Sequence, residues 1–150
     1  MSKEVFLGSD HRGFEKKNQL VETLRAEGYN VVDLGPDAYD EQDDYNDAAN
    51  NVAKAVREHA GSKGILICGS AHGIAIQANR YKGIRAIEGY TEDLARIGRE
   101  HNDANILCLS ADYIENNDFD KIANIFLNTE FGNEERHVRR NNKLDEVGEN

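Results

Sequence analysis

The chain contains 150 residues, of which 39% are hydrophobic and 31% charged, and its formal net charge is −10 at pH 7. These values predict one globular domain over residues 1–150, exclude a disordered chain, and argue against nucleic acid and membranes as partners because both are themselves anionic. No apolar run has the length of a membrane span and no export signal is seen, so we expect a cytoplasmic protein whose cysteines, Cys68 and Cys108, stay reduced.

Short runs of Val, Ile and Leu alternate along the chain with segments in which apolar residues recur at helical spacing, as at Phe14, Val21 and Leu24. The expected strands cover residues 4–7, 30–34, 65–68, 85–88 and 106–109. Strands that alternate with helices form βαβ units with right-handed crossovers. The predicted fold is therefore α/β: a three-layer α/β/α sandwich around a five-stranded parallel sheet of Rossmann-like type.

Two strongly charged segments lie outside these strands. Residues 33–47 carry acidic side chains without Lys or Arg, which predicts a solvated loop that leads into a helix near Asp47. Calcium binding is the alternative, but the oxygens lack the spacing of an EF-hand loop, and we expect no metal. The tail over 134–149 has few apolar anchors, so we expect a C-terminal helix that docks on its own subunit or on a partner subunit.

Polar residues that could react follow three of the expected elements. The first strand runs into Gly8-Ser9-Asp10-His11-Arg12-Gly13, the third into Cys68-Gly69-Ser70-Ala71-His72-Gly73, and the helix before the fifth strand ends in His101-Asn102-Asp103. Ligands of open α/β sheets bind beyond the carboxyl ends of the strands. We therefore expect all three segments at that edge of the sheet.

The loop after the third strand is the strongest candidate for a site. Gly69 and Gly73 permit positive φ and close backbone approach, and the next helix presents its first amides to the loop, which favours an anion. The same potential is expected to lower the pKa of Cys68 from about 8.5, so that its thiolate serves as a base beside a carbonyl. The alternative is a buried strand-end thiol followed by an ordinary turn.

Arg136 and Arg140 lie four residues apart in the expected last helix and therefore share one face. Two guanidinium groups at that spacing can clamp a phosphate. The alternative is a solvated basic face that pairs with Glu134 or Glu135. The histidines and cysteines show no zinc-like spacing, and Cys108 is expected to be a core thiol.

Several motifs occur together in one order along essentially the whole chain. They are Ser9-Asp10-His11-Arg12-Gly13, Asp44-Tyr45, Ile67-Cys68-Gly69-Ser70, Ala78-Asn79, Gly83-Ile84-Arg85-Ala86, His101-Asn102-Asp103-Ala104-Asn105 and Arg136-His137. This set resembles type B ribose-5-phosphate isomerase, a family that also includes allose-6-phosphate and galactose-6-phosphate isomerases. The resemblance implies the strand order 2-1-3-5-4, a phosphosugar substrate and no cofactor. It also implies a homodimer, with a tetramer as the alternative, whose sites lie at the subunit interface.

The resemblance implies roles for individual residues as well. Cys68 would move a proton between two carbons through a cis-enediolate, while Ser70 would bind sugar oxygens. His101, with Asp10 nearby, would assist opening of the sugar ring. The developing oxyanion would be held by the backbone amides of Gly69, Ser70, Ala71, His72 and Gly73. The remaining contacts would come from Tyr45 in the pocket wall, Asn102 on the enediolate, and His11, Arg136 and Arg140 on the phosphate.

Two positions depart from the family pattern. Ala71 stands where the family usually has Gly, and Asp112 stands where members often carry a phosphate-facing Arg. We hypothesise that Arg12 supplies the missing positive charge; the alternative is an exposed first-turn residue. The expected reaction interconverts ribose 5-phosphate and ribulose 5-phosphate. A six-carbon sugar phosphate as substrate and a non-catalytic phosphosugar-binding module are the alternatives.

Overall fold

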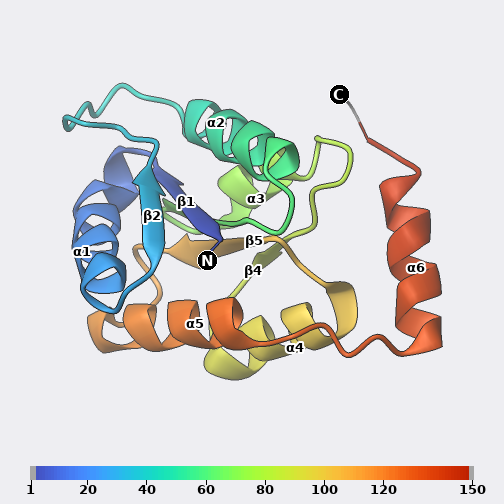
Figure 1. Cartoon of the computed structure of the whole chain (residues 1–150). Helices are drawn as coiled ribbons and strands as arrows, with labels where there is room; N and C mark the ends of the chain where they lie inside the picture. Colours follow the sequence, from blue (N-terminus) through green and yellow to red (C-terminus); the bar gives the residue numbers. More distant parts are fainter. Residues whose placement is uncertain (1–2, 149–150) are drawn as a thin grey trace.

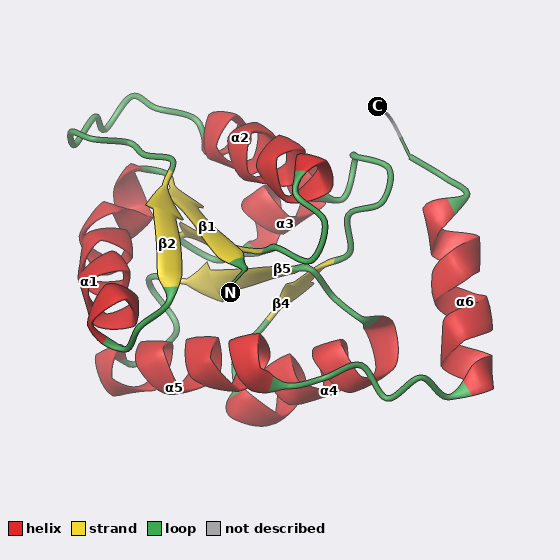
Figure 2. Ribbon diagram, viewed as in Figure 1, coloured by secondary structure: helices red, strands yellow, loops and turns green. Residues whose placement is uncertain are grey.

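The computed structural model describes residues 3–148, so residues 1, 2, 149 and 150 of the predicted domain and tail lie outside the described residues. One parallel sheet has the strand order β2-β1-β3-β5-β4, which confirms the predicted order (Figures 1 and 2). The strands are β1 (Glu4–Ser9), β2 (Asn30–Asp33), β3 (Lys63–Cys68), β4 (Ala86–Glu88) and β5 (Ile106–Ser110). The α-helices are α1 (Phe14–Ala26), α2 (Tyr45–Glu58), α3 (His72–Ala78), α4 (Glu92–Asn102), α5 (Asn116–Asn128) and α6 (Glu135–Asp145).

Helices cover both faces of the sheet, as the α/β/α prediction requires. Helices α2 and α3 lie on one face and α1, α4 and α5 on the other (Figure 2). Successive strand residues point to opposite faces, so Ile65 and Ile67 enter one core cluster while Leu66 and Cys68 enter the other. Cys108 is fully buried and free, which confirms the expected core thiol.

The acidic segment 33–47 is a loop that runs from β2 to α2, as predicted, and the helix begins at Tyr45. A buried lysine fastens the start of this loop. Lys17 of α1 has no exposed side-chain area, and its Nζ lies 3.0 Å from both carboxylate oxygens of Asp33 and from the Pro36 carbonyl oxygen. A buried ammonium requires such partners, so Lys17 holds the beginning of the loop against the body of the protein.

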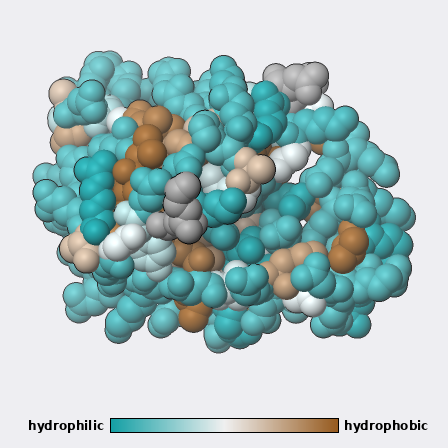
Figure 3. Space-filling model, in the orientation of Figure 1, coloured by the Kyte–Doolittle hydropathy of each residue, from teal (hydrophilic) through white to brown (hydrophobic). Residues whose placement is uncertain are grey.

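Helix α6 stands apart from the layers, on the side where the strands begin (Figure 1). The surface is hollowed between α6 and the rest of the molecule (Figure 3). The predicted apolar anchors of the tail stay exposed: Val138 by 36%, Leu144 by 53% and Val147 by 72%. The helix therefore keeps an apolar surface that its own subunit does not bury. None of the helices within residues 3–148 is long and apolar enough to cross a bilayer.

Candidate active site

The loop after β3 turns its carbonyl groups away from the candidate site. The carbonyl oxygens of Cys68, Gly69 and Ser70 all accept hydrogen bonds from residues at the end of β5 or just after β5 and β4. The donors are the Ala111 amide at 2.8 Å, the Ser110 hydroxyl at 2.6 Å, the Asp112 amide at 3.1 Å and the Tyr90 hydroxyl. Ala71 has φ of 74°, a left-handed conformation that reverses the chain into α3. The amide of His72 donates to the Ser70 hydroxyl at 3.2 Å, and those of Ser70 and Ala71 lie beside Cys68, so the loop gathers backbone donors of the kind that bind anions.

Cys68 lies at the centre of these amides. Burial raises the pKa of Cys68, and the nearby Asp10 carboxylate raises it further; the backbone amides of Ile74, Ala71 and Ser70 lower the pKa by a smaller amount. The net pKa of Cys68 is therefore above its ordinary value. The expected lowering is wrong for this subunit, because only 4% of Cys68 is exposed and desolvation disfavours the thiolate.

The end of β1 brings Asp10 to the same edge of the sheet, since Ser9 pairs with Ile67 just before Cys68. The Asp10 carboxylate accepts hydrogen bonds from the amides of Arg12 at 3.0 Å and Gly13 at 3.1 Å, and so closes the turn that follows β1. Burial raises the pKa of Asp10, although these two amides lower it. The predicted neighbourhood of Asp10 and Cys68 is confirmed.

Gly13 is required by the packing of this turn against β3. A Cβ placed on Gly13 would lie 2.6 Å from both the carbonyl oxygen and the Cγ2 of Ile67. We expect Gly13→Ala to destabilise the protein by about 1–3 kcal/mol, because the turn cannot move off the strand without losing its backbone contacts. Urea denaturation of the purified variant measures the change. A variant as stable as wild type would show that the turn is free to shift.

His11 is held by the acidic loop. Its backbone N and its Nδ1 lie 2.9 Å and 2.8 Å from Oδ1 of Asp43. This hydrogen bond raises the pKa of His11 above its ordinary value, with smaller contributions from Asp10. The imidazolium form, which attracts a phosphate, therefore persists to a higher pH than in a free histidine.

Tyr45 and Arg12 close two sides of the loop after β3. A Cβ on Gly73 would lie 2.5 Å from the Tyr45 ring, so Tyr45 does reach the loop and only Gly fits beneath it. Arg12 forms an ion pair with Asp112 directly above Gly69, whose added Cβ would lie 2.8 Å from Nε of Arg12. The negative charge of Asp112 is therefore neutralised by Arg12 beside this loop.

His72 is the loop residue that points furthest into solvent. Its side chain is 64% exposed, as expected, and its Nδ1 pairs with Glu88 at the end of β4. The same carboxylate lies 3.2 Å from the hydroxyl of Tyr90, which donates to the Ser70 carbonyl. The amide of His72 donates to the Ser70 hydroxyl at 3.2 Å. These contacts hold the outer half of the loop.

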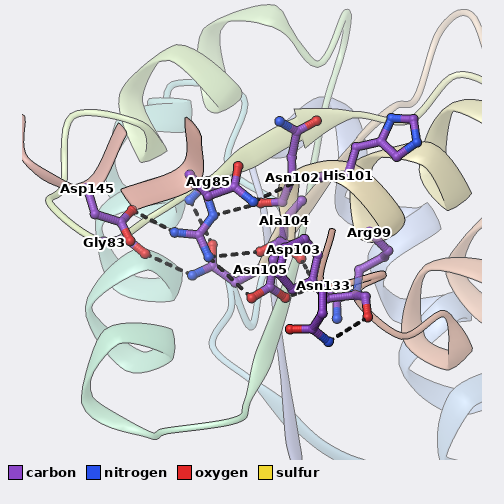
Figure 4. Close-up of polar contacts among 12 residues, drawn as sticks. Gly83, Arg85, Arg99, His101, Asn102, Asp103, Ala104, Asn105, Asn133 and Asp145 are labelled. Carbon is purple, nitrogen blue, oxygen red and sulfur yellow. Dashed lines mark hydrogen bonds and ion pairs between the residues drawn. The ribbon is translucent and has the colours of Figure 1, made fainter. Parts of the chain in front are cut away.

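A second group of candidate residues gathers around the end of α4 (Figure 4). The ring of His101 stacks on that of His137, with centroids 4.4 Å apart, and the backbone carbonyl of His101 accepts a hydrogen bond from Asn141 of α6 at 3.0 Å. Burial lowers the pKa of His137, and His101 and Arg136 lower it further. The His137 ring is thus favoured in its neutral form beside His101. Asn102 is exposed at the same helix end.

Helix α6 carries the two predicted phosphate arginines beside this group. Both Arg136 and Arg140 are exposed. Arg136 pairs with Glu134 at 3.1 Å, and its Nε lies 3.5 Å from Nε2 of His137. The predicted pairing with Glu134 is therefore present, but an exposed ion pair is weak enough for an incoming phosphate to replace it.

The two groups lie at opposite ends of the strands, the loop after β3 at the carboxyl end and the end of α4 at the amino end. β5 begins at Ile106, shortly after His101, and pairs with Cys68 only at its last residue, Ser110. The four steps between Ile106 and Ser110 span about 13 Å, so His101 and Cys68 are at least one strand length apart. The prediction that all three polar segments share the carboxyl edge is wrong for His101-Asn102-Asp103, because a helix between parallel strands ends where the next strand begins.

Several residues of these groups have no signal of their own in the sequence. Asp43, the partner of His11, is one of many acids in its loop, and Tyr90 follows β4 without any motif. Ser110, which binds the Gly69 carbonyl, reads as an ordinary strand residue. His137 appeared only beside Arg136 in the family resemblance. Their roles depend on contacts between residues far apart in the chain.

Comparison with known proteins gives one consistent family. The family described as Ribose/Galactose Isomerase matches residues 5–144. The probable ribose-5-phosphate isomerase B of Mycoplasma genitalium is 40% identical over 145 residues, which cover 96% of this chain and 95% of that protein. Ribose-5-phosphate isomerase B of Mycobacterium tuberculosis H37Rv is 35% identical over 138 residues, covering 91% of this chain and 84% of the relative.

Solved structures agree with the sequence relatives. The crystal structure of the Mycoplasma genitalium ribose-5-phosphate isomerase B with bound ribulose-5-phosphate superposes with a TM-score of 0.93 at 39% identity, covering 97% of this chain and 96% of that one. A Thermotoga maritima ribose 5-phosphate isomerase gives a TM-score of 0.91 at 39% identity, covering 98% of this chain and 100% of the other. The backbone fold and the sequence of this chain therefore match these isomerases over nearly its full length.

Proposed function

The chain belongs to the ribose/galactose isomerase family, and on that premise we propose that it interconverts ribose 5-phosphate and ribulose 5-phosphate with Cys68 as the base. The observation that carries this proposal is the Cys68 thiol, beside the backbone amides of the loop and of the first turn of α3, in a fold that matches an isomerase holding ribulose-5-phosphate. Proton transfer between neighbouring carbons needs one base and a site that stabilises an enediolate. The loop after β3 supplies both.

The Cys68 thiolate would remove the proton from C2 of the open-chain aldose, so that negative charge develops on the two oxygens of a cis-enediolate. The hydroxyl proton of O2 would then pass to O1, and the Cys68 thiol would return its proton to C1 as the carbonyl forms at C2, which leaves the ketose. The amides from Gly69 to Gly73 would hold the charge of the enediolate, with its oxygens replacing the Ser70 hydroxyl as acceptor of the His72 amide. Ser70 would bind sugar oxygens beside them, and Asp10 would assist opening of the sugar ring from the same edge.

A complete site requires a second subunit. The groups expected to assist ring opening and to bind the enediolate are His101 and Asn102. They lie at the end of the strands opposite Cys68, together with Arg136 and Arg140. One subunit therefore cannot bring the base and these groups onto one sugar. We propose a homodimer in which the carboxyl edge of one subunit faces the α4–α6 group of the other, that is, His101 and Asn102 of α4 with Arg136 and Arg140 of α6. His11 of one subunit and the two arginines of its partner would then share the phosphate.

An apolar groove supports this arrangement. A groove of about 660 Å³ lies between the start of β4 and the end of α6, lined in part by Tyr81, Ile84, Leu144 and Val147. Leu144 and Val147 stay largely exposed in one subunit. A second copy of the chain is the occupant that both buries this groove and delivers the missing half of each site. The sedimentation coefficient of a monomer at assay concentration would contradict the proposed homodimer.

The direct test of function is a spectrophotometric assay of ribose 5-phosphate conversion, run in parallel with allose 6-phosphate. We expect turnover of ribose 5-phosphate. Preferential turnover of allose 6-phosphate would move the assignment to a six-carbon substrate. Binding of either compound without turnover would leave only a phosphosugar-binding module.

The raised pKa of Cys68 predicts how activity depends on pH. A base must be deprotonated, and a raised pKa means that the thiolate fraction grows only as the pH rises through the higher value. We therefore expect kcat/KM to keep rising above the ordinary thiol pKa of about 8.5. A pH profile of kcat/KM across the neutral and alkaline range measures this. A profile already level below that value would mean that the dimer lowers the pKa of Cys68.

The hypothesis that Arg12 contributes charge for the phosphate can be tested through its partner. We expect Arg12→Ala to raise the KM for ribose 5-phosphate about tenfold, because the carboxylate of Asp112 would then face the phosphate without a counter-charge. Adding Asp112→Asn separates two roles. Recovery of the KM in the double variant means that Arg12 only neutralises Asp112, whereas no recovery means that Arg12 contacts the phosphate. An unchanged KM in Arg12→Ala would reject both.

A further inference from the structure

Arg85 lies immediately before β4, away from both groups of candidate residues in the sequence, yet its guanidinium reaches two distant parts of the chain, the end of α4 and the end of α6 (Figure 4). Nε donates to the carbonyl oxygen of Asn102 at 2.8 Å, Nη2 to that of Asp103 at 3.1 Å, and Nη1 to the carboxylate of Asp145 at 2.6 Å. Only 15% of the Arg85 side chain is exposed. The backbone of Arg85 is also fixed, since its amide donates to the Asn105 side chain at 2.8 Å.

The first two of these bonds set the position of the end of α4. The last carbonyls of a helix lack intrahelical partners, and here the guanidinium of Arg85 supplies them. The next residue, Asp103, adopts a left-handed conformation with φ of 45°, and its carboxylate is bound by Arg99 at 2.8 Å. His101 and Asn102 point away from Arg85 in Figure 4, so the guanidinium holds the backbone from which they project without contacting their side chains.

The third bond sets the position of α6. Asp145 is the last residue of this helix, which stands apart from the sheet and contacts α4 through Asn141 and His137. The ion pair with Arg85 therefore fastens the free end of the helix. Because the same guanidinium binds both helix ends, Arg85 acts together with the direct contacts of Asn141 and His137 in setting the spacing between His101 on α4 and Arg140 on α6.

We propose that Arg85 is a positioning residue, which holds the ring-opening and enediolate groups of α4 in register with the phosphate-binding arginines of α6. This inference rests on the proposed function, because it requires that both groups act on one phosphosugar. Arginine suits the role, since its planar fork donates in three directions at once, whereas lysine carries the same charge at a single point. The Arg85 side chain is largely buried whereas that of Asp145 is 41% exposed, so salt screens this ion pair less than one between two exposed side chains.

The test compares Arg85→Lys and Arg85→Met with Arg96→Met. Arg96 is a suitable control because it also lies on α4, but its ion pairs are with Asp93 and Glu100 of the same helix and bind neither the carbonyls of Asn102 and Asp103 nor α6. We expect both Arg85 variants to lose about 10²-fold in kcat on ribose 5-phosphate, since an ångström of displacement at a reacting group has that cost. We expect Asp145→Asn, which releases only α6, to raise KM with little change in kcat.

Two further measurements separate positioning from general stability. Thermal unfolding and sedimentation show whether each variant is folded and assembled at the assay temperature. The imidazole cross-peaks of His101 and His137 in a ¹H–¹⁵N spectrum of the substrate-free protein should shift in both Arg85 variants and stay in place in Arg96→Met.

The outcomes are distinguishable from failure of the proposed function. Unmoved imidazole cross-peaks, or a kcat equal to that of Arg96→Met in a folded and assembled Arg85 variant, would overturn the positioning role. Full recovery of kcat in Arg85→Lys would overturn it as well, because charge alone would then suffice. If the wild-type protein does not turn over ribose 5-phosphate, the proposed function fails, while the imidazole spectra still report whether Arg85 places the end of α4.

Discussion

Cys68→Ala is expected to lower kcat on ribose 5-phosphate by about 10²–10⁴-fold, which is the contribution of a positioned general base. The substitution removes the only thiol that the loop amides of Ser70, Ala71 and Ile74 surround. KM should change little, because the thiol acts on a carbon-bound proton and the phosphate contacts remain. Steady-state kinetics on the purified variant give both constants.

The second cysteine supplies a matched control. Cys108 is also free and buried, but it lies within β5 in the core, and burial raises its pKa well above the ordinary value. We expect Cys108→Ala to lower stability through a small cavity while its folded fraction keeps near wild-type kcat. Near-normal kcat in Cys68→Ala would reject the thiol as base and direct attention to Asp10, the carboxylate whose charge acts on Cys68.

Mixing two inactive variants is expected to restore activity if each site spans two subunits. Cys68→Ala disables the carboxyl edge of a subunit and His101→Ala disables its α4–α6 group, and these lie at opposite ends of the strands. In a mixed dimer, one of the two sites then receives two intact halves. Random reassociation of equal amounts should return about a quarter of wild-type activity, because half of the dimers are mixed.

The matched control mixes two variants of the same edge. Cys68→Ala and His11→Ala both alter the carboxyl edge, so every site in their mixed dimer contains one damaged half and no activity should return. Recovery in this control would point to exchange or contamination. Absence of recovery in the first mixture, after subunit exchange is verified by native mass spectrometry, would contradict a site shared across the interface.

The strand pattern determined the fold. Each expected strand is present; β1, β3 and β5 are marked by runs rich in Val, Ile and Leu because they are buried in the middle of the sheet, while β4 (Ala86–Glu88) at its edge is short and half-buried. Cys108 was predicted as a core thiol for the same reason. The identity of the reactive loop was also available from sequence, since Cys68 and its flanking Gly residues stand where a strand ends and a helix begins.

Three features were decided only by the tertiary structure. The net pKa of Cys68 depends on the balance between burial and three amides, and sequence shows the amides but not the depth of the thiol. The hydrogen bond of His11 to Asp43 joins residues 32 positions apart, so the acidic composition of the loop could not single out that carboxylate. Most importantly, the order of elements places His101 at the beginning of β5 and Cys68 at the end of β3. Residue types along the chain determined which groups can do the chemistry. The direction of the strands determined that one subunit holds these groups at opposite ends of the sheet. The physical reason is that each helix between parallel strands returns the chain to the end of the sheet at which the strands begin.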